Sequence, residues 1–565
     1  MSLLEASSRN ASSRNNVNGV RTHEVTNQPP PLVDYNVFEA DRVMTEAVRR
    51  EGAGWAEQRI SAVGEIAGRA DVIELGRQAN ENSPKLRTHD RYGNRIDEVE
   101  FHPSWHELMR LGIGHELHSL PWREPQPGGH VARAAALMCF SQAEAGVGCP
   151  ISMTYSVVPA LRHQPELAEE WEPRILSDTY DPREIAAADK RGSLFGMGMT
   201  EKQGGSDVRA NTTVARPING GGPGGEYEIT GHKWFFSAPQ CDAFLVLAQA
   251  EGGISCFLLT RRLPDGELNR FRLQRLKDKL GNRSNASSEI EFDGALVRLV
   301  GEEGAGVRTI IEMVNHTRLD CATGSATEMR FGVAQAINHA SHRSTFGKTL
   351  VEQPLMQNVL ADLAVESEAA TISSLRLARA YDEAIAGDDE AQALKRIANA
   401  VLKYWICKRG PSHAVECLEC LGGNGYVEES GMPRLYREAP LASIWEGSGN
   451  VQCLDVLRAM VKNPDSVEAF FAEVGEAAGE PRLDDYVSEL RSDLTDMTGI
   501  ESRARRLVER MALALQGSLV LRFGDEAVAD AFVASRLAGD WGRAFGTLPA
   551  GSDFGRIIER HTVAA

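Results

Sequence analysis

The spacing of apolar residues changes once along this chain and later changes back. From Gly192 to about Leu299, apolar and polar residues alternate in short runs such as GEYEITGHKWFFSA and DAFLVLAQA, separated by Gly, Pro, Asp or Asn. Alternation with a period of two is typical of half-buried β-strands. On both sides of this stretch the apolar residues follow the 3.6-residue period of helices. The sequence therefore predicts a mainly α-helical protein with one central β domain, a small sandwich or barrel.

Five segments follow from this pattern. They are an extended or disordered arm at 1–34, a helical domain at 35–190, the β domain at 191–299, a helical bundle at 300–464 and an additional helical domain at 465–565. Within the bundle, long helices are expected over 306–344, 354–386, 389–421 and 448–462. The short loops between them indicate antiparallel packing. A chain of 565 residues is too long for one ordinary core, so several domains are expected.

Net charge and cysteine content argue against several classes of protein. The net charge of −18 means that the molecule as a whole repels nucleic acids and anionic membranes, and no apolar stretch reaches transmembrane length. Nine scattered cysteines favour a reducing compartment, so a cytoplasmic protein is expected. The Ser-, Asn- and Arg-rich start predicts a disordered arm, with a transit peptide as the second alternative. His106, His115 and His118 have no acidic residue at metal-ligand spacing, so no metal site is predicted.

Four motifs combine glycines, aromatic residues and polar side chains. They are GMGMTEKQGGSD (196–207), GHKWFFSA (231–238), SHRSTFGKTLVEQPLMQ (341–357) and CLGGNGY (420–426). These residue types suit a planar polar ring with a diphosphate tail. Aromatic faces can stack on the ring, amides and hydroxyls can bind its edges, and arginine and glycine backbone can bind phosphate. Each motif alone could equally be a turn or a packed corner.

A fifth motif, IWEGSGN (444–450), places Glu446 between a tryptophan and a glycine. The order and spacing of the five motifs resemble those of the acyl-CoA dehydrogenase flavoprotein superfamily, over roughly residues 35–460. The N-terminal segment, the KDKLGNRSNAS stretch and the extra C-terminal region resemble its AidB-like branch. That branch is associated with the adaptive response to DNA alkylation.

The resemblance implies a homotetramer that binds non-covalent FAD at its subunit interfaces. The implied cofactor-binding residues are Met199, Thr200, Gly205, Ser206, Trp234, Phe235, Ser237, Arg343, Phe346, Gln353, Gly422, Gly423, Gly425, Ser448 and Asn450. Those from Arg343 to Gly425 are implied to reach the adenosine end of a neighbouring subunit's FAD. The implied substrate is a short or branched acyl-CoA such as isovaleryl-CoA, and electron-transfer flavoprotein is a candidate electron acceptor.

Glu446 falls on the position of the family's catalytic base. Removing the weakly acidic α-proton of a thioester requires a base that is fixed beside the flavin and partly desolvated, and burial against Trp445 would raise the pKa of the carboxyl group. Gly447 is expected to leave room for the acyl chain, and Arg318 and Trp445 are expected to contact substrate. The alternative is an acidic residue that is favoured at a helix N-terminus by the helix dipole.

Several positions depart from the family pattern. Some relatives carry the base on an earlier bundle helix, where this chain has Thr317, so Glu446 is the candidate that remains. Lys202 and Gly204 replace a proline and an alanine of the flavin loop, which leaves the shape of that loop open. Glu419 replaces a glutamine before the glycine-rich turn, which weakens one expected FAD contact.

The C-terminal region supplies a competing function, binding of double-stranded DNA, because the AidB-like branch is associated with it. From Asp465 to Ala565 the sequence has 11 arginines, no lysine and 18 acidic residues, which disfavours binding by the region as a whole. Arg503, Arg506 and Arg510 share one helix face and could form a phosphate-contacting stripe. A solvated helix face in ion pairs, or a region that seals subunit contacts, are the alternatives.

Overall fold

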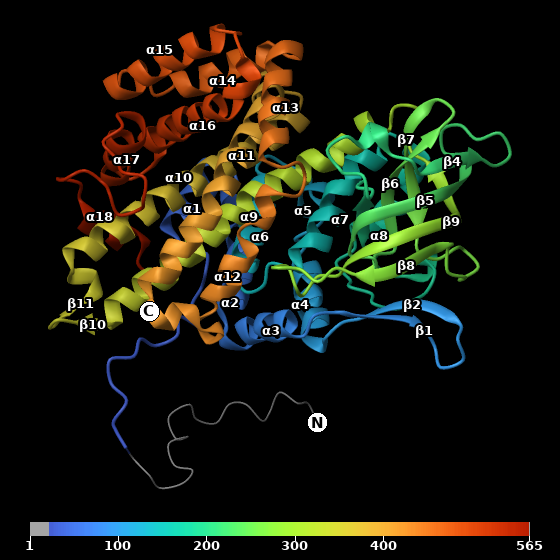
Figure 1. Cartoon of the computed structure of the whole chain (residues 1–565), viewed down its shortest axis with the longest axis horizontal. Coiled ribbons are helices and arrows are strands. Elements are labelled where there is room, and N and C mark those ends of the chain that lie inside the picture. The colour runs from blue at the N-terminus through green and yellow to red at the C-terminus, as the bar shows by residue number, and fades with distance from the viewer. Residues whose placement is uncertain (1–21, 564–565) are drawn as a thin grey trace.

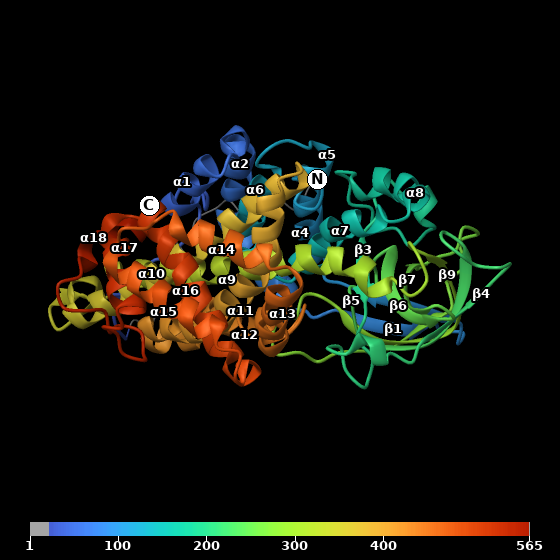
Figure 2. The same ribbon diagram turned by 90° about the horizontal axis from the view of Figure 1, so that it is seen from above.

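The computed structural model describes residues 22–563 (Figure 1). The β domain lies at one end of the long axis, and the helical bundle extends from it toward the other end. The C-terminal helices, orange to red in Figure 2, cover one side of the bundle. The predicted order of helical, β and helical regions is confirmed. Of the predicted arm, residues 1–21 lie outside the described residues, and residues 22–34 contain no helix or strand.

The N-terminal domain is built around two helices with almost no polar face. Its helices are α1 (Arg42–Arg50), α2 (Glu57–Gly68), α3 (Ala70–Glu81), α4 (Pro103–Gly114), α5 (Leu120–Arg123), α6 (Gly129–Phe140), α7 (Gly148–Leu161) and α8 (Pro165–Ile175). Every residue of α6 and most residues of α7 are buried. A helix that is apolar all round is covered on all sides, and these two lie between the outer helices and the bundle.

A β-hairpin interrupts the helical pattern that the sequence predicts for this domain, and this part of the prediction is wrong. Strands β1 (Lys85–His89) and β2 (Arg95–Glu100) pair through a turn in which Gly93 has a φ of 85°. The hairpin reaches the β domain, since Arg261 donates to the carbonyl of Asp97 at 2.9 Å. Its stabilisation is therefore tertiary, which a search for local helical period cannot detect.

The β domain closes on itself as a barrel. Its strands are β3 (Phe195–Gly198), β4 (Val214–Pro217), β5 (Glu226–Ser237), β6 (Ala243–Ala250), β7 (Gly253–Thr260), β8 (Phe271–Leu276) and β9 (Ser287–Leu299). Neighbours pair in the order β6, β4, β5, β9, β7, and β7 pairs back to β6. Closure removes most free strand edges. The glycine-rich stretch NGGGPGGE forms the turn between β4 and β5.

The bundle matches its predicted helix ends to within two residues. It contains α9 (Gly306–His342), α10 (Pro354–Ile385), α11 (Asp389–Cys420), α12 (Met432–Glu438) and α13 (Gly449–Lys462). A small hairpin of β10 (Ser344–Thr345) and β11 (Lys348–Thr349) connects α9 to α10. Local signals fix these ends, because Pro354 occupies the first turn of α10 and the Asp388 side chain accepts from Ala391 N at the start of α11.

The C-terminal region packs on the outer face of the bundle. Its elements are α14 (Asp465–Gly475), α15 (Pro481–Thr495), α16 (Ile500–Phe523), α17 (Glu526–Phe532), a π-helical turn (Val533–Leu537) and α18 (Phe554–His561). Helices α14 and α16 contact α11, and α16 and α18 contact α10. A buried ion pair reinforces the contact, since Arg536 and Asp362 lie 2.5 Å apart with fully buried side chains.

Three sequence expectations concern membrane-spanning helices, cysteines and metal sites. Within residues 22–563, no helix combines the length and the apolar character that a membrane crossing requires. All nine cysteines lie in that range, and each is unpaired and buried. Among the same residues, no group of three or more His, Cys, Asp or Glu side chains has the arrangement of a metal site.

Candidate active site

Glu446 lies in a tight loop directly before α13. Its φ is 57°, in the left-handed region that residues with a side chain rarely adopt, and Gly447 follows with a φ of 96°. Two successive positive φ angles turn the chain sharply into the helix. Backbone strain of this kind persists only where the surrounding structure holds it.

Two buried side chains hold the carbonyl groups of this loop. Lys403 Nζ, from α11, donates to the carbonyl of Trp445 at 2.7 Å and to that of Gly447 at 2.5 Å. Gln452 Nε2, from α13, donates to the carbonyls of Glu446 and Gly447 at 3.0 and 2.9 Å. A tight loop would otherwise bury these acceptors unpaired, at a cost of about 1–3 kcal/mol each. The loop is therefore fixed by the bundle itself.

Arg318 supports the same loop from α9. Its Nε donates to the carbonyl of Glu446 at 3.0 Å, and its Nη1 lies 3.0 Å from Asp455 Oδ2. Both side chains of this ion pair are about nine-tenths buried. The guanidinium that we expected to contact substrate is thus engaged beneath the loop. The structure gives Arg318 a role in positioning the loop.

The carboxyl group of Glu446 has one hydroxyl neighbour and several positive charges around it. Thr317 Oγ1 lies 2.8 Å from Glu446 Oε2 and 3.0 Å from the carbonyl oxygen of Val314. Burial raises the pKa of Glu446 above its ordinary value, and the Thr317 hydrogen bond and the charges of Lys403 and Arg318 oppose that rise. The predicted upward shift is confirmed in direction.

The positive φ of residue 447 favours glycine, and the space beside its Cα is not open. A Cβ at this position would lie 2.7 Å from Gln452 Nε2 and 3.0 Å from Val451 Cγ1. A side chain at this position would therefore meet α13, and the role of Gly447 beside an acyl chain stays a prediction. Trp445 is half-buried against the core, and its buried indole N–H has no partner among the described residues.

The first flavin motif folds back on the second. Trp234 N donates to the carbonyl of Thr200 at 2.8 Å, and Lys233 Nζ lies 2.8 Å from Glu201 Oε1 with both side chains fully buried. Gly204, one of the departures from the family pattern, has a φ of 137° and closes a turn by donating to the carbonyl of Glu201 at 3.0 Å. An alanine would be strained there. The altered loop is therefore a defined turn that is anchored to β5.

The remaining residues of these motifs lie beside that turn. Met199 is partly buried, Gly205 approaches Thr200, Ser206 is exposed, and Ser237 ends β5. Phe235 is 51% exposed on β5, and Lys277 Nζ lies 3.4 Å from the ring centroid of Trp234. An exposed aromatic face with a cation beside it suits a planar, anionic ligand such as FAD.

Asn285, which the sequence did not single out, is a buried residue between β8 and β9. It is 1% exposed, and neither polar atom of its side-chain amide has a partner among the described residues. Burial raises the pKa of Cys149 to about 12. A buried amide without a partner is costly unless a ligand or water completes it. This region therefore fits a polar ring edge.

The other implied cofactor residues lie at the opposite end of the bundle. Arg343 and Phe346 belong to the β10–β11 hairpin, Gln353 precedes α10, and Gly422, Gly423 and Gly425 form a turn after α11. Phe346 is fully exposed with a φ of 51°. From Arg318 to Arg343, α9 extends roughly 38 Å at 1.5 Å per residue. The two groups of implied cofactor residues therefore lie far apart within one chain.

The C-terminal region reaches the residues just after the loop. Ser448 is the residue before α13, and Arg505 Nε of α16 donates to Asn450 Oδ1 at 2.8 Å. Of the three arginines considered for DNA, Arg506 is exposed, whereas Arg503 and Arg510 bind α15 and the segment after it. Two of the three arginines are therefore in ion pairs, as the alternative interpretation of this helix face expects.

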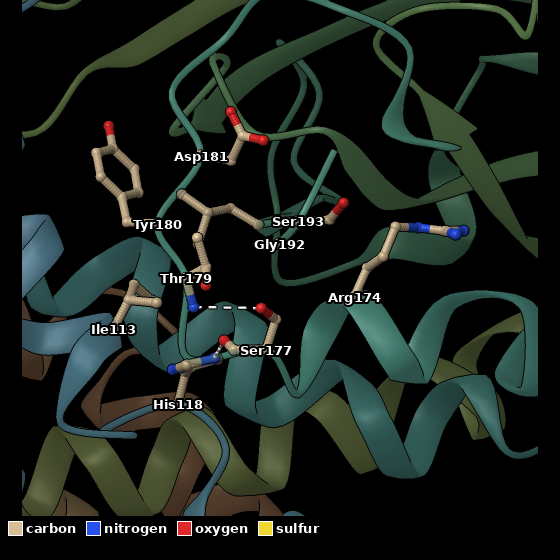
Figure 3. Close-up of a pocket in the computed structure, with 10 residues that line it drawn as sticks. Ile113, His118, Arg174, Ser177, Thr179, Tyr180, Asp181, Gly192 and Ser193 are labelled. Atoms are coloured by element: carbon tan, nitrogen blue, oxygen red, sulfur yellow. Dashed lines mark hydrogen bonds between the residues drawn. The ribbon is translucent and has the colours of Figure 1, made fainter. Parts of the chain in front are cut away.

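A water-sized cavity of about 10 Å³ lies elsewhere, between α4, α8 and residues 177–194 (Figure 3). His118 lines it, with Nε2 3.0 Å from the carbonyl oxygen of Ser177. Burial lowers the pKa of His118 to about 4, so it is neutral. His118 is thus a core histidine, and the cavity is too small for a cofactor.

Comparison with known proteins finds a matching family domain for the N-terminal helical domain, the β domain and the bundle. Residues 27–182 match the adaptive response protein AidB N-terminal domain. Residues 196–295 match the acyl-CoA dehydrogenase middle domain, and residues 304–461 match the acyl-CoA dehydrogenase C-terminal domain.

Three relatives extend over most of the chain. The AidB protein of Escherichia coli is 46% identical over 516 residues, which cover 91% of this chain and 94% of that protein. Acyl-CoA dehydrogenase family member 11 of Caenorhabditis elegans is 31% identical over 512 residues, 86% of this chain and 80% of that protein. The crystal structure of C. elegans ACDH-11 in complex with C11-CoA superposes with a TM-score of 0.83 at 28% identity, covering 93% and 95% of the two chains. The chain therefore belongs to the acyl-CoA dehydrogenase family, in the branch that contains AidB.

Proposed function

We propose that this protein dehydrogenates an acyl-CoA and that Glu446 is the base that removes the α-proton. The family is FAD-dependent, and bound FAD supplies the acceptor for the hydride that leaves the β-carbon. The observation that carries the proposal is the half-buried Glu446 carboxyl group with its raised pKa, on a strained loop whose carbonyl groups accept hydrogen bonds from three helices. A fixed base with a raised pKa suits removal of a weakly acidic proton.

Thr317 can accommodate both protonation states of the base. When Glu446 is ionised, the Thr317 hydroxyl donates to Oε2. When Glu446 has taken the proton, its O–H can donate to Thr317 Oγ1 while the threonine hydroxyl turns to the carbonyl of Val314, 3.0 Å away. No other side chain has to move. The bond to the ionised form is the stronger of the two, because it is charge-assisted.

This arrangement predicts the pH dependence of Thr317→Val. The variant loses a hydrogen bond that holds the pKa of Glu446 down, so that pKa rises further. Because the base must be ionised to act, the rate of flavin reduction rises with pH, and its acidic limb moves to higher pH in the variant. Stopped-flow flavin reduction across pH checks this result. Unchanged midpoints in the two proteins would contradict it, and Thr323→Val, which removes a hydroxyl one and a half turns further along α9, is the matched control.

The test of the reaction itself is anaerobic mixing of the FAD-loaded protein with a panel of acyl-CoAs. We propose a short or branched acyl chain, and the panel includes isovaleryl-CoA together with C11-CoA, which the C. elegans relative holds. Bleaching of the flavin absorbance by at least one of them is expected. If the yellow protein is bleached by none of them, the dehydrogenase proposal fails. Electron-transfer flavoprotein is the proposed acceptor, and reoxidation in its presence tests it.

We further propose that FAD binds between subunits of a homotetramer. The support is the separation of the two groups of implied cofactor residues along α9, together with the exposure of Phe346 on the β10–β11 hairpin. Two chains would each supply one group, and the exposed ring would be covered. Sedimentation of the FAD-loaded protein tests this proposal: a monomer that retains bound FAD would reject it.

Duplex DNA binding through the C-terminal region has less support, because Arg503 and Arg510 already have partners in the same chain. A gel-shift titration across salt concentrations tests it. Phosphate contacts weaken as salt rises, so a complex with that dependence would favour this function. A duplex that does not shift even at low salt would reject it.

A further inference from the structure

The described part of the N-terminal arm lies against the far end of the bundle. Residues 22–34 contain no helix or strand, yet their contacts are specific. They meet three segments that are distant in sequence: the end of α9, the β10–β11 hairpin and the glycine turn after α11. The last two carry the implied adenosine-side residues of the FAD site. The arm therefore lies where that half of the cofactor would bind.

Asn27 makes the densest of these contacts. Its side-chain amide pairs with both backbone groups of Ser344, donating to the carbonyl at 2.8 Å and accepting from the N–H at 2.7 Å. Its own carbonyl accepts from Arg343 Nη1 at 2.5 Å. The Asn27 side chain thus pairs with the hairpin backbone as a neighbouring strand would. Its main-chain carbonyl oxygen orients the guanidinium of Arg343. Its φ of 57° is one that asparagine tolerates better than most residues.

Two further bonds tie the arm to the neighbouring segments. The carbonyl of Pro30 accepts from Asn338 Nδ2 of α9 at 3.0 Å. Gln28 Oε1 accepts from Asn424 Nδ2 of the glycine turn at 3.3 Å. The consecutive prolines at 29–31 stiffen the chain between these points. One stiff segment therefore bridges the hairpin and the glycine turn.

The hairpin needs such support. Strands β10 and β11 have two residues each and pair only with each other among the described residues. An isolated two-stranded hairpin is marginally stable in water, so a ligand that binds it must first order it. A segment that orders the hairpin in advance lowers that cost and strengthens binding.

We infer that arm residues 27–30 are a positioning element of the adenosine half of the FAD site, which pre-orders Arg343 and the hairpin against the glycine turn. The inference rests on the proposed function, since it requires that FAD binds there. In this role the arm helps the protein to retain the cofactor, and it takes no part in proton removal. Asn27 is a positioning residue that acts through Arg343 and Ser344.

The experiment compares FAD affinity in the full-length protein and four variants, without substrate. Asn27→Ala removes the two side-chain bonds to Ser344, and a chain that begins at residue 32 removes all of these arm contacts. A chain that begins at residue 22 and His23→Ala retain them, because the His23 ring bonds only Thr22 among the described residues. FAD dissociation constants come from flavin fluorescence, and hydrogen exchange reports order at residues 343–349. The thermal midpoint of each apo-protein shows that the fold is intact.

The expected result is a 5- to 30-fold weaker FAD affinity for Asn27→Ala, about what the loss of its two neutral side-chain hydrogen bonds to Ser344 gives. Faster exchange at 343–349 should accompany it, with an unchanged thermal midpoint and unchanged controls. Equal affinity in the full-length, Asn27→Ala and residue-32 proteins would overturn the inference. A full-length protein that does not bind FAD at all would instead reject the proposed function, so the two failures are distinguishable.

Discussion

Replacing Glu446 with glutamine should reduce the rate of flavin reduction by an acyl-CoA about 10²- to 10⁴-fold, the usual contribution of a positioned general base. Glutamine keeps the shape and can still accept from Thr317, so the strained loop and its bonds to Lys403 and Gln452 should survive. The flavin spectrum and the FAD affinity should therefore stay unchanged. Single-turnover stopped-flow absorbance measures the rate.

Glu429→Gln is the matched control, because Glu429 is an exposed glutamate in the same domain. Its rate should equal that of the unaltered protein. If Glu446→Gln reduced its flavin as fast as this control, Glu446 would not be the base. Loss of FAD from Glu446→Gln would point to a structural role for the carboxylate.

Replacing Arg536 with methionine should lower the free energy of unfolding by about 3–5 kcal/mol, because it leaves a buried carboxylate without its ion pair. Asp362 Oδ1 lies 2.5 Å from Arg536 Nη2, and both side chains are fully buried. The second oxygen of Asp362 accepts from Gly546 N at 2.8 Å, so the carboxylate cannot turn to solvent. Urea unfolding that is followed by circular dichroism measures the change.

Arg556→Met provides the comparison. Arg556 pairs with Asp525 in the same C-terminal region, but its side chain is 47% exposed. Solvent screens such a pair, so its removal should change the unfolding midpoint little. Similar midpoints for the two variants would show that the buried pair does not hold the C-terminal region on the bundle.

Elements that are stabilised locally were predicted closely from the sequence. The four long bundle helices carry their own periodicity, and Asp388 and Pro354 mark two of their starts. The β domain was predicted as a sandwich or barrel, but not its closure, because one pairing of Val214 with Gln249 across 35 residues completes it. The β1–β2 hairpin was missed for the same reason, since contacts with the β domain stabilise it.

For the site, the motifs identified Glu446 but not what holds it. Lys403 and Gln452 lie in ordinary helical sequence, and only the fold brings their side chains to the loop carbonyls. A lysine on the apolar face of α11 was the available signal, because a buried lysine needs partners. Asn285 lay within a stretch that we quoted for its resemblance, yet nothing in its spacing indicates that its amide is buried without a partner.

The length of α9 is constrained from both ends. Near its start, Thr317 and Arg318 touch the residue that we propose as the base, and its last turn leads into Arg343. Inserting a single residue between these points would rotate one end against the other by about 100° and shift it by about 1.5 Å. Such a change would misplace either the base or the hairpin. This helix should therefore tolerate substitution far better than insertion or deletion, even at positions that contact neither end.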